Sequence, residues 1–321
     1  MNWKQPQDLR SFTGLRVAGL LAYVTVLILL PAPPARAGAE FTLESARAAA
    51  TNNDAPAEYF LARCYAKGTG VPRDFVQAAE YMRQAAEQGL AAAQNDLGAF
   101  YARGRGVKQD YAEAARWYRR AAEQGDALAE YSLGRSLLEG RGVPTNIMEG
   151  LQWYQKAAAQ NQPDALLALG DIYLNGSGGI QVDRQAAAVW FEKAVAQGRL
   201  DALNSLGFIY EQQSAGSDGA ANLARAVNYY REAAEKGDAR GQMNLGRMYF
   251  AGFGVKSDPV EAYKWFYLAA QNGEGIADHY LKLLNGADPL TKQPMTPEQT
   301  AAAVQRANDF LKDHPKKIGK E

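Results

Sequence analysis

A helix-length frame recurs six times along this chain of 321 residues, and this repetition constrains the fold more than any other feature. Each frame begins with Asp or Asn, carries an aromatic residue 7 positions later, and reaches Gly or Asn 15 positions after its start. An Asp or Asn side chain caps the first turn of a helix, and Gly or Asn tolerates the positive φ that ends one. Each frame therefore predicts one helix of about four turns. The frames are Asp74–Gly89, Asp110–Gly125, Asn146–Asn161, Asp183–Gly198, Asn222–Gly237 and Asp258–Gly273.

A second helix is predicted upstream of each frame. Five frames are preceded by Leu-Gly, and a large side chain follows each Leu after four residues, which places both on one helical face. Glycine in a helix costs roughly 0.5–1 kcal/mol relative to Ala, so five such glycines indicate close contact with a neighbouring helix. The Leu residues are Leu97, Leu133, Leu169, Leu206 and Leu245, with Leu61-Ala62 as a variant, and the paired residues are Tyr65, Tyr101, Leu137, Tyr173, Tyr210 and Tyr249.

The two helices of most units are joined by a Gly-x-Gly turn, as at Gly104 and Gly106. A phosphate-binding glycine loop would follow a strand, whereas these glycines follow a helix and recur, so they indicate a turn that requires positive φ. In the fifth unit the turn is replaced by a polar segment from Glu211 to Gly219, for which we expect a longer loop.

A chain of self-similar helix pairs buries its core between neighbouring pairs. The sequence therefore predicts an all-α superhelical solenoid of about six helix-pair repeats with terminal capping helices. We assign 38–53 to an N-terminal capping helix with Thr42 as its N-cap, 274–313 to a partial seventh repeat and a C-terminal capping helix that begins at Thr296, and 314–321 to a polar tail. The six repeats are assigned to 54–89, 90–125, 126–161, 162–198, 199–237 and 238–273.

The repeating unit resembles that of Sel1-like repeat proteins, a tetratricopeptide-like family. Its pattern is approximately A-x-x-x-L-G-x-x-Y-x-x-G-x-G-V-x-x-D-x-x-x-A-x-x-W-Y-x-x-A-A-x-Q-G, which residues 93–125 match nearly residue for residue. The resemblance implies an α/α solenoid that acts as a scaffold or adaptor for other proteins, and bacterial relatives are often exported. For exported relatives with paired cysteines, binding or hydrolysis of β-lactams has been proposed. This chain has only Cys64, so that activity is not carried over.

The N-terminus has the composition of a secretory signal. Lys4, Arg10 and Arg16 precede an apolar stretch from Val17 to Leu30, which prolines and an Ala-x-Ala pattern follow. Such a stretch is short for a bilayer span of ~20 residues but fits the core of a signal peptide. We expect residues 1–37 to be a cleaved signal peptide and the mature chain to be periplasmic. The alternative is an uncleaved N-terminal anchor that faces the same compartment.

Catalytic and nucleic-acid-binding patterns are absent from the sequence. Without residues 1–37 the formal charge is −3, which leaves no basic excess for a phosphate backbone. Cys64 occupies an apolar helix position and cannot form an internal disulfide, and His279 and His314 have no spacing that suggests a shared metal. The carboxylates recur at fixed repeat positions, as solvated helical faces do. We therefore predict no catalytic residue, metal or cofactor.

Each predicted second helix carries large aromatic residues, such as Trp117-Tyr118, next to Ala pairs, such as Ala121-Ala122. Large residues against small ones at a regular spacing are typical of interlocking helices. We interpret these aromatics as core rather than as a ligand cage.

Binding is expected to use the positions that vary between repeats. On the first helix of each pair, one stripe lies away from the Leu and Tyr positions. In similar solenoids the first helices line the concave surface, although a solvated face without a partner would show the same pattern. The candidate binding residues on this stripe are Arg63, Lys67, Asp96, Arg103, Arg135, Glu139, Asp171, Asn175, Phe208, Asn244 and Arg247.

Together these observations predict an exported, non-enzymatic scaffold, adaptor or regulator, most simply a monomer, that binds another protein or, as a second choice, a glycan or peptidoglycan fragment. One alternative is an envelope hydrolase or a protein that binds β-lactams or peptidoglycan fragments. Another is a structural component of a polysaccharide-export or secretion assembly. We expect neither nucleic-acid binding nor membrane insertion after signal cleavage.

Overall fold

The computed structural model describes residues 41–215, 218–286 and 294–314. Within these residues the secondary structure consists of fifteen α-helices and one short 3₁₀ helix, without any strand, which confirms the all-α class. None of the described helices combines the length and the apolar character that a bilayer crossing requires. The predicted signal peptide, residues 1–37, and most of the polar tail lie outside the described residues.

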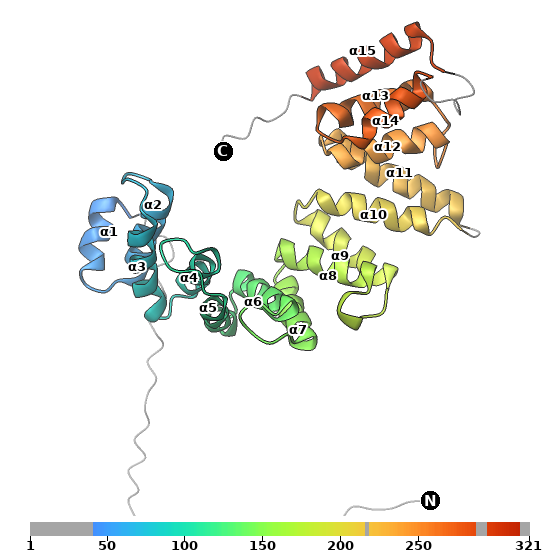
Figure 1. The fold of residues 1–321 in the computed structure, drawn as a ribbon. Helices are drawn as coiled ribbons and strands as arrows, with labels where there is room; N and C mark the ends of the chain where they lie inside the picture. Colours follow the sequence, from blue (N-terminus) through green and yellow to red (C-terminus); the bar gives the residue numbers. More distant parts are fainter. Residues whose placement is uncertain (1–40, 216–217, 287–293, 315–321) are drawn as a thin grey trace, which may run out of the picture. The chain divides into compact units, whose positions relative to one another are not determined.

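Six helix pairs follow one another along the chain, and each helix packs against the next one in sequence (Figure 1). The first helices are α2 (Ala55–Lys67), α4 (Ala91–Arg103), α6 (Ala127–Glu139), α8 (Pro163–Asn175), α10 (Asp201–Gln212) and α12 (Ala239–Ala251). The second helices are α3 (Phe75–Glu87), α5 (Tyr111–Glu123), α7 (Ile147–Ala159), α9 (Arg184–Ala196), α11 (Gly219–Glu235) and α13 (Pro259–Gln271). This arrangement confirms the predicted repeat solenoid.

Three further helices flank the pairs: α1 (Leu43–Ala50) packs on α2, and α14 (Ile276–Leu284) and α15 (Pro297–Asp313) both pack on α13. Thr42 caps α1 and Thr296 caps α15, each in a capping box. Because α15 covers α13, the apolar residues at that end of the described array are withdrawn from water, which a terminal repeat requires.

The predicted N-caps are confirmed for five of the six second helices. The side chain of Asp110, for example, accepts hydrogen bonds from the backbone N–H groups of Ala112 and Glu113. The prediction for Asn222 was wrong, because α11 begins earlier, at Gly219, and Asn222 lies within its first turn. There its side-chain amide donates to the carbonyl oxygen of Gln213 at 2.8 Å. All six residues predicted to end these helices have positive φ, from +59° at Asn161 to +93° at Gly89.

The Leu-Gly glycines let the first helix approach an aromatic ring of the second helix. A Cβ built on Gly134 would lie 2.6 Å from the Tyr154 ring, and one built on Gly170 would lie 2.6 Å from the Phe191 ring. Carbon atoms do not approach each other this closely, so no other residue fits there without displacing a buried ring. The close helix contact inferred from these glycines is confirmed.

The second glycine of the Gly-x-Gly turn contacts the preceding repeat. A Cβ on Gly106 would lie 1.8 Å from the carbonyl oxygen of Phe75, and one on Gly142 would lie 2.1 Å from that of Tyr111. Both glycines also have positive φ. The turn therefore joins two helices and fixes the spacing between neighbouring repeats.

The aromatic positions of the second helices are buried to different degrees. Trp117 and Trp265 are buried, whereas Trp153 and Trp190 are only half-buried. A lysine lies over each half-buried ring: Lys156 Nζ lies 3.9 Å from the centroid of Trp153, and Lys193 Nζ lies 4.5 Å from that of Trp190. Their role is packing, as predicted, with cation–π contacts at the rim.

Polar side chains are buried at the start of four first helices. Glu58 and Glu130 accept hydrogen bonds from Gln88 and Gln160 at the end of the second helix of the same repeat, at 2.6 and 2.9 Å. Gln94 and Gln242 accept corresponding bonds from Gln124 and Asn272. In the fourth and fifth repeats Leu166 and Leu203 take this position and are fully buried. These hydrogen bonds tie together the two helices of these four pairs at one end.

Candidate binding surface on the first helices

The eleven predicted binding residues all lie on the first helices and are exposed or half-exposed. We call this set the first-helix face; it consists of Arg63, Lys67, Asp96, Arg103, Arg135, Glu139, Asp171, Asn175, Phe208, Asn244 and Arg247. The leucine and glycine residues on the opposite side of these helices are buried. These positions are thus accessible from the surface, and their role in binding stays a prediction.

Three residues of the first-helix face bridge neighbouring repeats. Asp96 on α4 accepts a hydrogen bond from the hydroxyl of Tyr59 on α2 at 2.9 Å. Asn244 on α12 lies 3.5 Å from Asn204 on α10. Arg247 binds Glu211, as described next. These side chains contribute to the alignment of the repeats, and any binding role would be additional.

Arg247, Glu211 and Tyr230 form a cluster between the fifth and sixth repeats, which we call the Arg247 cluster. Both terminal nitrogens of Arg247 donate to the carboxylate of Glu211, at 2.8 and 2.7 Å, and the Tyr230 hydroxyl donates to the same carboxylate at 3.0 Å. Burial and the adjacent Glu211 carboxylate raise the pKa of Tyr230, and the hydrogen bonds to Glu211 raise that of Arg247. The Glu211 side chain is only 14% exposed, so its charge is held largely away from water.

The sequence had placed Glu211 in a loop, and this prediction was wrong. Glu211 belongs to the last turn of α10, which ends at Gln212. All six first helices end six residues after the conserved Leu, so Glu211, five residues after Leu206, lies within its helix. There Arg247 and Tyr230 give the Glu211 side chain two partners. Residues 216–217 of the segment between α10 and α11 lie outside the described residues.

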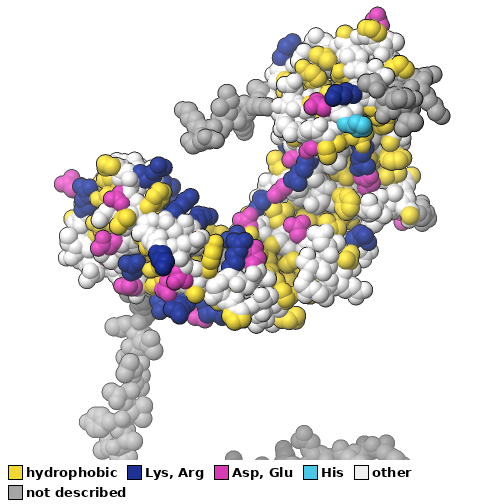
Figure 2. Space-filling model, viewed as in Figure 1, with side chains coloured by type: hydrophobic (Ala, Val, Ile, Leu, Met, Phe, Trp, Pro, Cys, Tyr) yellow, Lys and Arg dark blue, Asp and Glu magenta, His cyan; other side chains and the backbone are white. Residues whose placement is uncertain are grey.

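Charged and apolar side chains are distributed unevenly on the surface. On the face drawn in Figure 2, Lys and Arg side chains are frequent over the first repeats, and hydrophobic side chains are more continuous over the later ones. Among large apolar residues, Phe208 on α10 is 44% exposed, Phe250 on α12 is 37% exposed, and Phe253 in the following turn is 46% exposed. Exposed aromatics are frequent anchors in protein interfaces.

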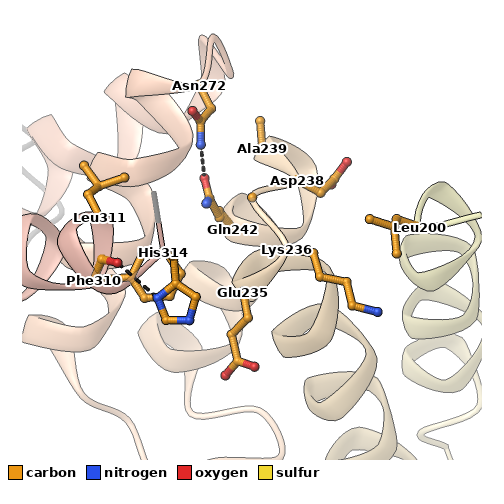
Figure 3. Close-up of a pocket in the computed structure, with 11 residues that line it drawn as sticks. Leu200, Glu235, Lys236, Asp238, Ala239, Gln242, Asn272, Phe310, Leu311 and His314 are labelled. Atoms are coloured by element: carbon orange, nitrogen blue, oxygen red, sulfur yellow. Dashed lines mark hydrogen bonds between the residues drawn. The ribbon is translucent and has the colours of Figure 1, made fainter. Parts of the chain in front are cut away.

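The hollow drawn in Figure 3, of about 790 Å³, lies near the described C-terminal end and is formed by the α11–α12 turn, the end of α13 and the end of α15. Two side-chain contacts join its lining residues: Asn272 donates to Gln242 at 2.8 Å, and the His314 ring lies 3.0 Å from the carbonyl oxygen of Phe310. Figure 3 shows that the charged groups of Glu235 and Lys236 point in different directions. The arrangement offers no nucleophile paired with a base.

Other reactive side chains do not form a site either. Cys64 is buried at 6% exposure, as predicted, and burial raises the pKa of its thiol, which disfavours the reactive thiolate. His279 and His314 are both exposed. Across residues 41–215, 218–286 and 294–314, no group of three His, Cys, Asp or Glu residues is placed to hold a metal ion.

Comparison with known proteins identifies the repeat. The model of the Sel1 repeat matches six times, at residues 55–90, 91–126, 127–162, 163–198, 200–238 and 239–274. An F-box protein of Arabidopsis thaliana is 48% identical over 59 residues, which make up 18% of this chain and 16% of that protein. This chain therefore matches only a small part of that relative's length.

Two solved structures share the fold over most of the chain. One is a protective antigen present in uropathogenic Escherichia coli strains and described as displaying an SLR fold; it is 32% identical with a TM-score of 0.72, over 84% of this chain and 56% of that protein. The other is a Sel1 repeat protein from Oxalobacter formigenes, which is 30% identical with a TM-score of 0.63, over 78% of this chain and 96% of that protein. With its six repeat matches and these structural relatives, the chain belongs to the Sel1 repeat family.

Proposed function

We propose that this protein is an exported, non-enzymatic scaffold that holds another protein along the first-helix face. Sel1 repeats generally mediate protein–protein interaction, and this chain has six of them. The exported state and the site of binding are our inferences. They are supported by the signal-like N-terminus and by the way residues vary over the first helices.

One contrast supports this proposal: the buried Leu position is constant in all repeats, whereas a surface position close to it varies. The Leu of each first helix is fully buried in all six repeats. Two residues after it, the side chain changes in charge and size from repeat to repeat and is exposed or partly buried. At this position the six repeats carry Arg63, Ala99, Arg135, Asp171, Phe208 and Arg247. Packing does not require such diversity, whereas recognition of one specific partner uses it.

Phe208 is the residue of this face best suited to anchor a partner. It is 44% exposed on α10, and each Phe withdrawn from water at an interface contributes through its large apolar area. Charged residues nearer the N-terminal end of the array, such as Arg63 and Lys67, would then orient the same partner.

Site-specific photocrosslinking tests the proposal. Benzoylphenylalanine is introduced in place of Phe208 or Arg63 on the first helices, and in place of Val76 or Met148 at exposed positions of the second helices, 62% and 65% exposed. In cells that express the protein, we expect one protein to be crosslinked from Phe208 and Arg63 and identified by mass spectrometry. Equal crosslinking from Val76 and Met148 would show that binding is not confined to the first-helix face. If no position gives a specific crosslink, the scaffold function is rejected.

Export is tested separately. If residues 1–37 are removed on export, the protein in the periplasmic fraction begins at Gly38, which the intact mass of the purified protein will show. A mass corresponding to the full 321 residues, with the protein in the membrane fraction, would instead indicate an uncleaved anchor.

A further inference from the structure

Two neighbouring-repeat junctions of this chain combine an Arg two residues after the conserved Leu with a Tyr on the second helix of the preceding repeat. Between the fifth and sixth repeats these residues are Arg247 and Tyr230, and between the second and third repeats they are Arg135 and Tyr118. The remaining junctions have Ala99, Asp171, Phe208 or Leu283 at the Arg position. The two junctions are therefore close internal copies of each other.

The copies differ in the residue that stands between Arg and Tyr in the Arg247 cluster. There the carboxylate of Glu211, five residues after Leu206, accepts hydrogen bonds from both partners. The equivalent residue of the second repeat, five residues after Leu97, is Ala102. Between the second and third repeats Arg135 and Tyr118 are present, but the carboxylate that would join them is missing.

A hollow of about 420 Å³ occupies the corresponding place, and Ala102, Tyr118 and Arg135 all line it. At the fifth and sixth repeats the hollow at the same place measures about 260 Å³, is lined by Glu211, and has neither Tyr230 nor Arg247 in its lining. With the short side chain of Ala102, Arg135 and Tyr118 line the hollow, whereas Glu211 stands between their copies and the other hollow.

The hollow between the second and third repeats is lined by more positive charge than the hollow between the fifth and sixth repeats. Arg103 and Arg141 line it, at positions that Gln212 and Phe253 hold in the other hollow. Arg141 is paired with Glu139 at 2.5 Å. Within the described part of the chain, Arg103 and Arg135 form no ion pair with any carboxylate, and the nearby Asp96 accepts the hydrogen bond from Tyr59. Two guanidinium groups of the described residues thus line the hollow without a carboxylate at ion-pair distance.

Arg135 and Tyr118 each have close neighbours at this hollow. The guanidinium carbon of Arg135 lies 5.8 Å from the centre of the Tyr131 ring, one turn earlier on α6. Tyr118 is 5% exposed; burial and the negative charge of Asp96 raise the pKa of its hydroxyl, while the positive charges of Arg135 and Arg103 oppose that rise. Arg103, Arg135 and Tyr118 thus line one hollow.

We propose that the hollow lined by Ala102, Arg103, Tyr118 and Arg135 binds a carboxylate of a partner polypeptide, in the place that Glu211 fills within the chain at the fifth–sixth junction. The inference rests on the proposed function, because it assigns one anchoring point of the partner to the first-helix face. Arg135 and Tyr118 donate to the incoming carboxylate, and Arg103 adds a second positive charge. The carboxylate belongs either to an acidic side chain or to a C-terminus.

A test within the chain does not depend on any partner. Ala102→Glu supplies the missing carboxylate in cis, and the copy of this junction shows that a Glu at that position reaches both Arg and Tyr. We expect Ala102→Glu to raise the melting temperature above that of Ala102→Gln, which has the same shape without the charge. An Ala102→Glu variant that melts at or below the temperature of Ala102→Gln would show that the hollow does not accept a carboxylate.

Binding is tested with three acetylated alanine pentapeptides added to the full chain. The first has a central Glu and an amidated C-terminus, the second a central Gln and an amidated C-terminus, and the third only alanines with a free C-terminal carboxylate. Titration is followed by calorimetry and by the arginine side-chain NMR signals. We expect the first or the third peptide to bind at least tenfold more tightly than the Gln peptide and to shift the Arg135 signal. The peptide that binds distinguishes a side-chain carboxylate from a C-terminal one.

Variants then locate the bound peptide. We expect Arg135→Met and Ala102→Glu to weaken carboxylate-peptide binding at least tenfold, and Arg116→Met to leave it unchanged. Arg116 is the matched control because it is an exposed Arg on α5 that does not line the hollow. Equal binding of the Gln peptide, or binding that survives Ala102→Glu, would overturn the proposal. If a partner is still crosslinked from Phe208 in that case, the scaffold function stands and only this anchoring point is rejected.

Discussion

A Cβ built on Gly98 of α4 would lie 2.7 Å from the ring of Tyr118 on α5, the helix that follows it in the same repeat. The same glycine–ring contact recurs in the next four repeats. The first repeat is the exception on both sides of the contact, because Ala62 replaces the glycine and Met82 replaces the ring. Both are buried in one cluster. The glycine is therefore needed where a rigid ring faces it, and a flexible side chain removes the need.

This relationship predicts the outcome of a double substitution. Gly98→Ala should cost about 1–3 kcal/mol through overpacking, although Ala by itself favours a helix over Gly by about 1 kcal/mol. Adding Tyr118→Met reproduces the pair of the first repeat and should recover part of the loss. Chemical denaturation of the two single variants and the double variant measures the coupling, and strictly additive losses would contradict the contact.

The turn glycines predict a contrast between two substitutions of the same type. Gly106 and Gly125 both have positive φ, at +66° and +85°, but a Cβ on Gly106 would lie 1.8 Å from the Phe75 carbonyl oxygen, whereas a Cβ on Gly125 meets nothing within 4 Å. Gly125→Ala should therefore cost only the backbone strain of about 1–2 kcal/mol. Gly106→Ala should cost clearly more, since two repeats must move apart. Similar melting temperatures for both variants would show that the turn does not set the repeat spacing.

The buried indole of Trp117 predicts a large truncation cost. Trp117 is 5% exposed, and the guanidinium of Arg120 lies 4.5 Å from its ring centre. Trp117→Ala should destabilise the protein by about 3–5 kcal/mol, because a cavity replaces a large buried side chain. Trp190→Ala removes the half-buried equivalent of the fourth repeat and should cost less. Thermal unfolding of both variants checks the order, and an unchanged melting temperature for Trp117→Ala would reject its core position.

The repeat architecture could be predicted from the sequence because local signals and packing agree at most positions. Asp110 caps a helix through two backbone N–H groups, and Gly98 marks a close contact that needs no other residue. These signals act over a few residues or between adjacent helices. The prediction failed at Asn222 and Glu211 in the fifth repeat, which lacks the Gly-x-Gly turn: α11 begins three residues before Asn222, and Glu211 lies in the last turn of α10.

The candidate site was only partly predictable, because it depends on contacts between repeats. The pattern identified Arg135 and Arg247 as equivalent surface residues. It could not show that Arg247 is bound by Glu211 while Arg135 faces a hollow, since that difference arises 33 to 36 residues away, at Ala102 and Glu211. An aligned comparison of the repeats could have found it: only two junctions combine an Arg with a Tyr, and only one of these has the Glu.

The buried carboxyls of Glu58 and Glu130 predict a pH-dependent gain in stability. Burial raises the pKa of both groups, so the native state holds their protons more tightly than the unfolded chain does. Their contribution to stability is then greatest below the unfolded pKa of about 4.3, and it is lost as the pH rises through the native pKa. Replacing both by Gln keeps an acceptor for Gln88 and Gln160 without a charge, so the variant should be more stable than the original protein at pH 7.5.

The measurement is thermal unfolding between pH 4 and pH 7.5. The advantage of Glu58→Gln with Glu130→Gln should shrink as the pH falls towards 4, where both carboxyls of the original protein are protonated. Glu80→Gln, at an exposed position of α3, is the control and should show no such change. A stability difference that is independent of pH, or that grows as the pH falls, would contradict the raised pKa values.

The Arg247 cluster predicts that its three residues stabilise the junction between the fifth and sixth repeats as a unit. Glu211→Ala leaves Arg247 and Tyr230 without their shared acceptor and should cost about 1.5–3 kcal/mol, the range for hydrogen bonds to a charged group. Tyr230→Phe removes one of these bonds and should cost about 0.5–1.5 kcal/mol alone. In the Glu211→Ala background the same change should cost nearly nothing, since the hydroxyl has already lost its acceptor. Denaturant unfolding of the four proteins measures this coupling. Equal costs of Tyr230→Phe in both backgrounds would show that its hydroxyl does not act through Glu211. The Arg247 cluster would then no longer support carboxylate binding at the hollow next to Ala102.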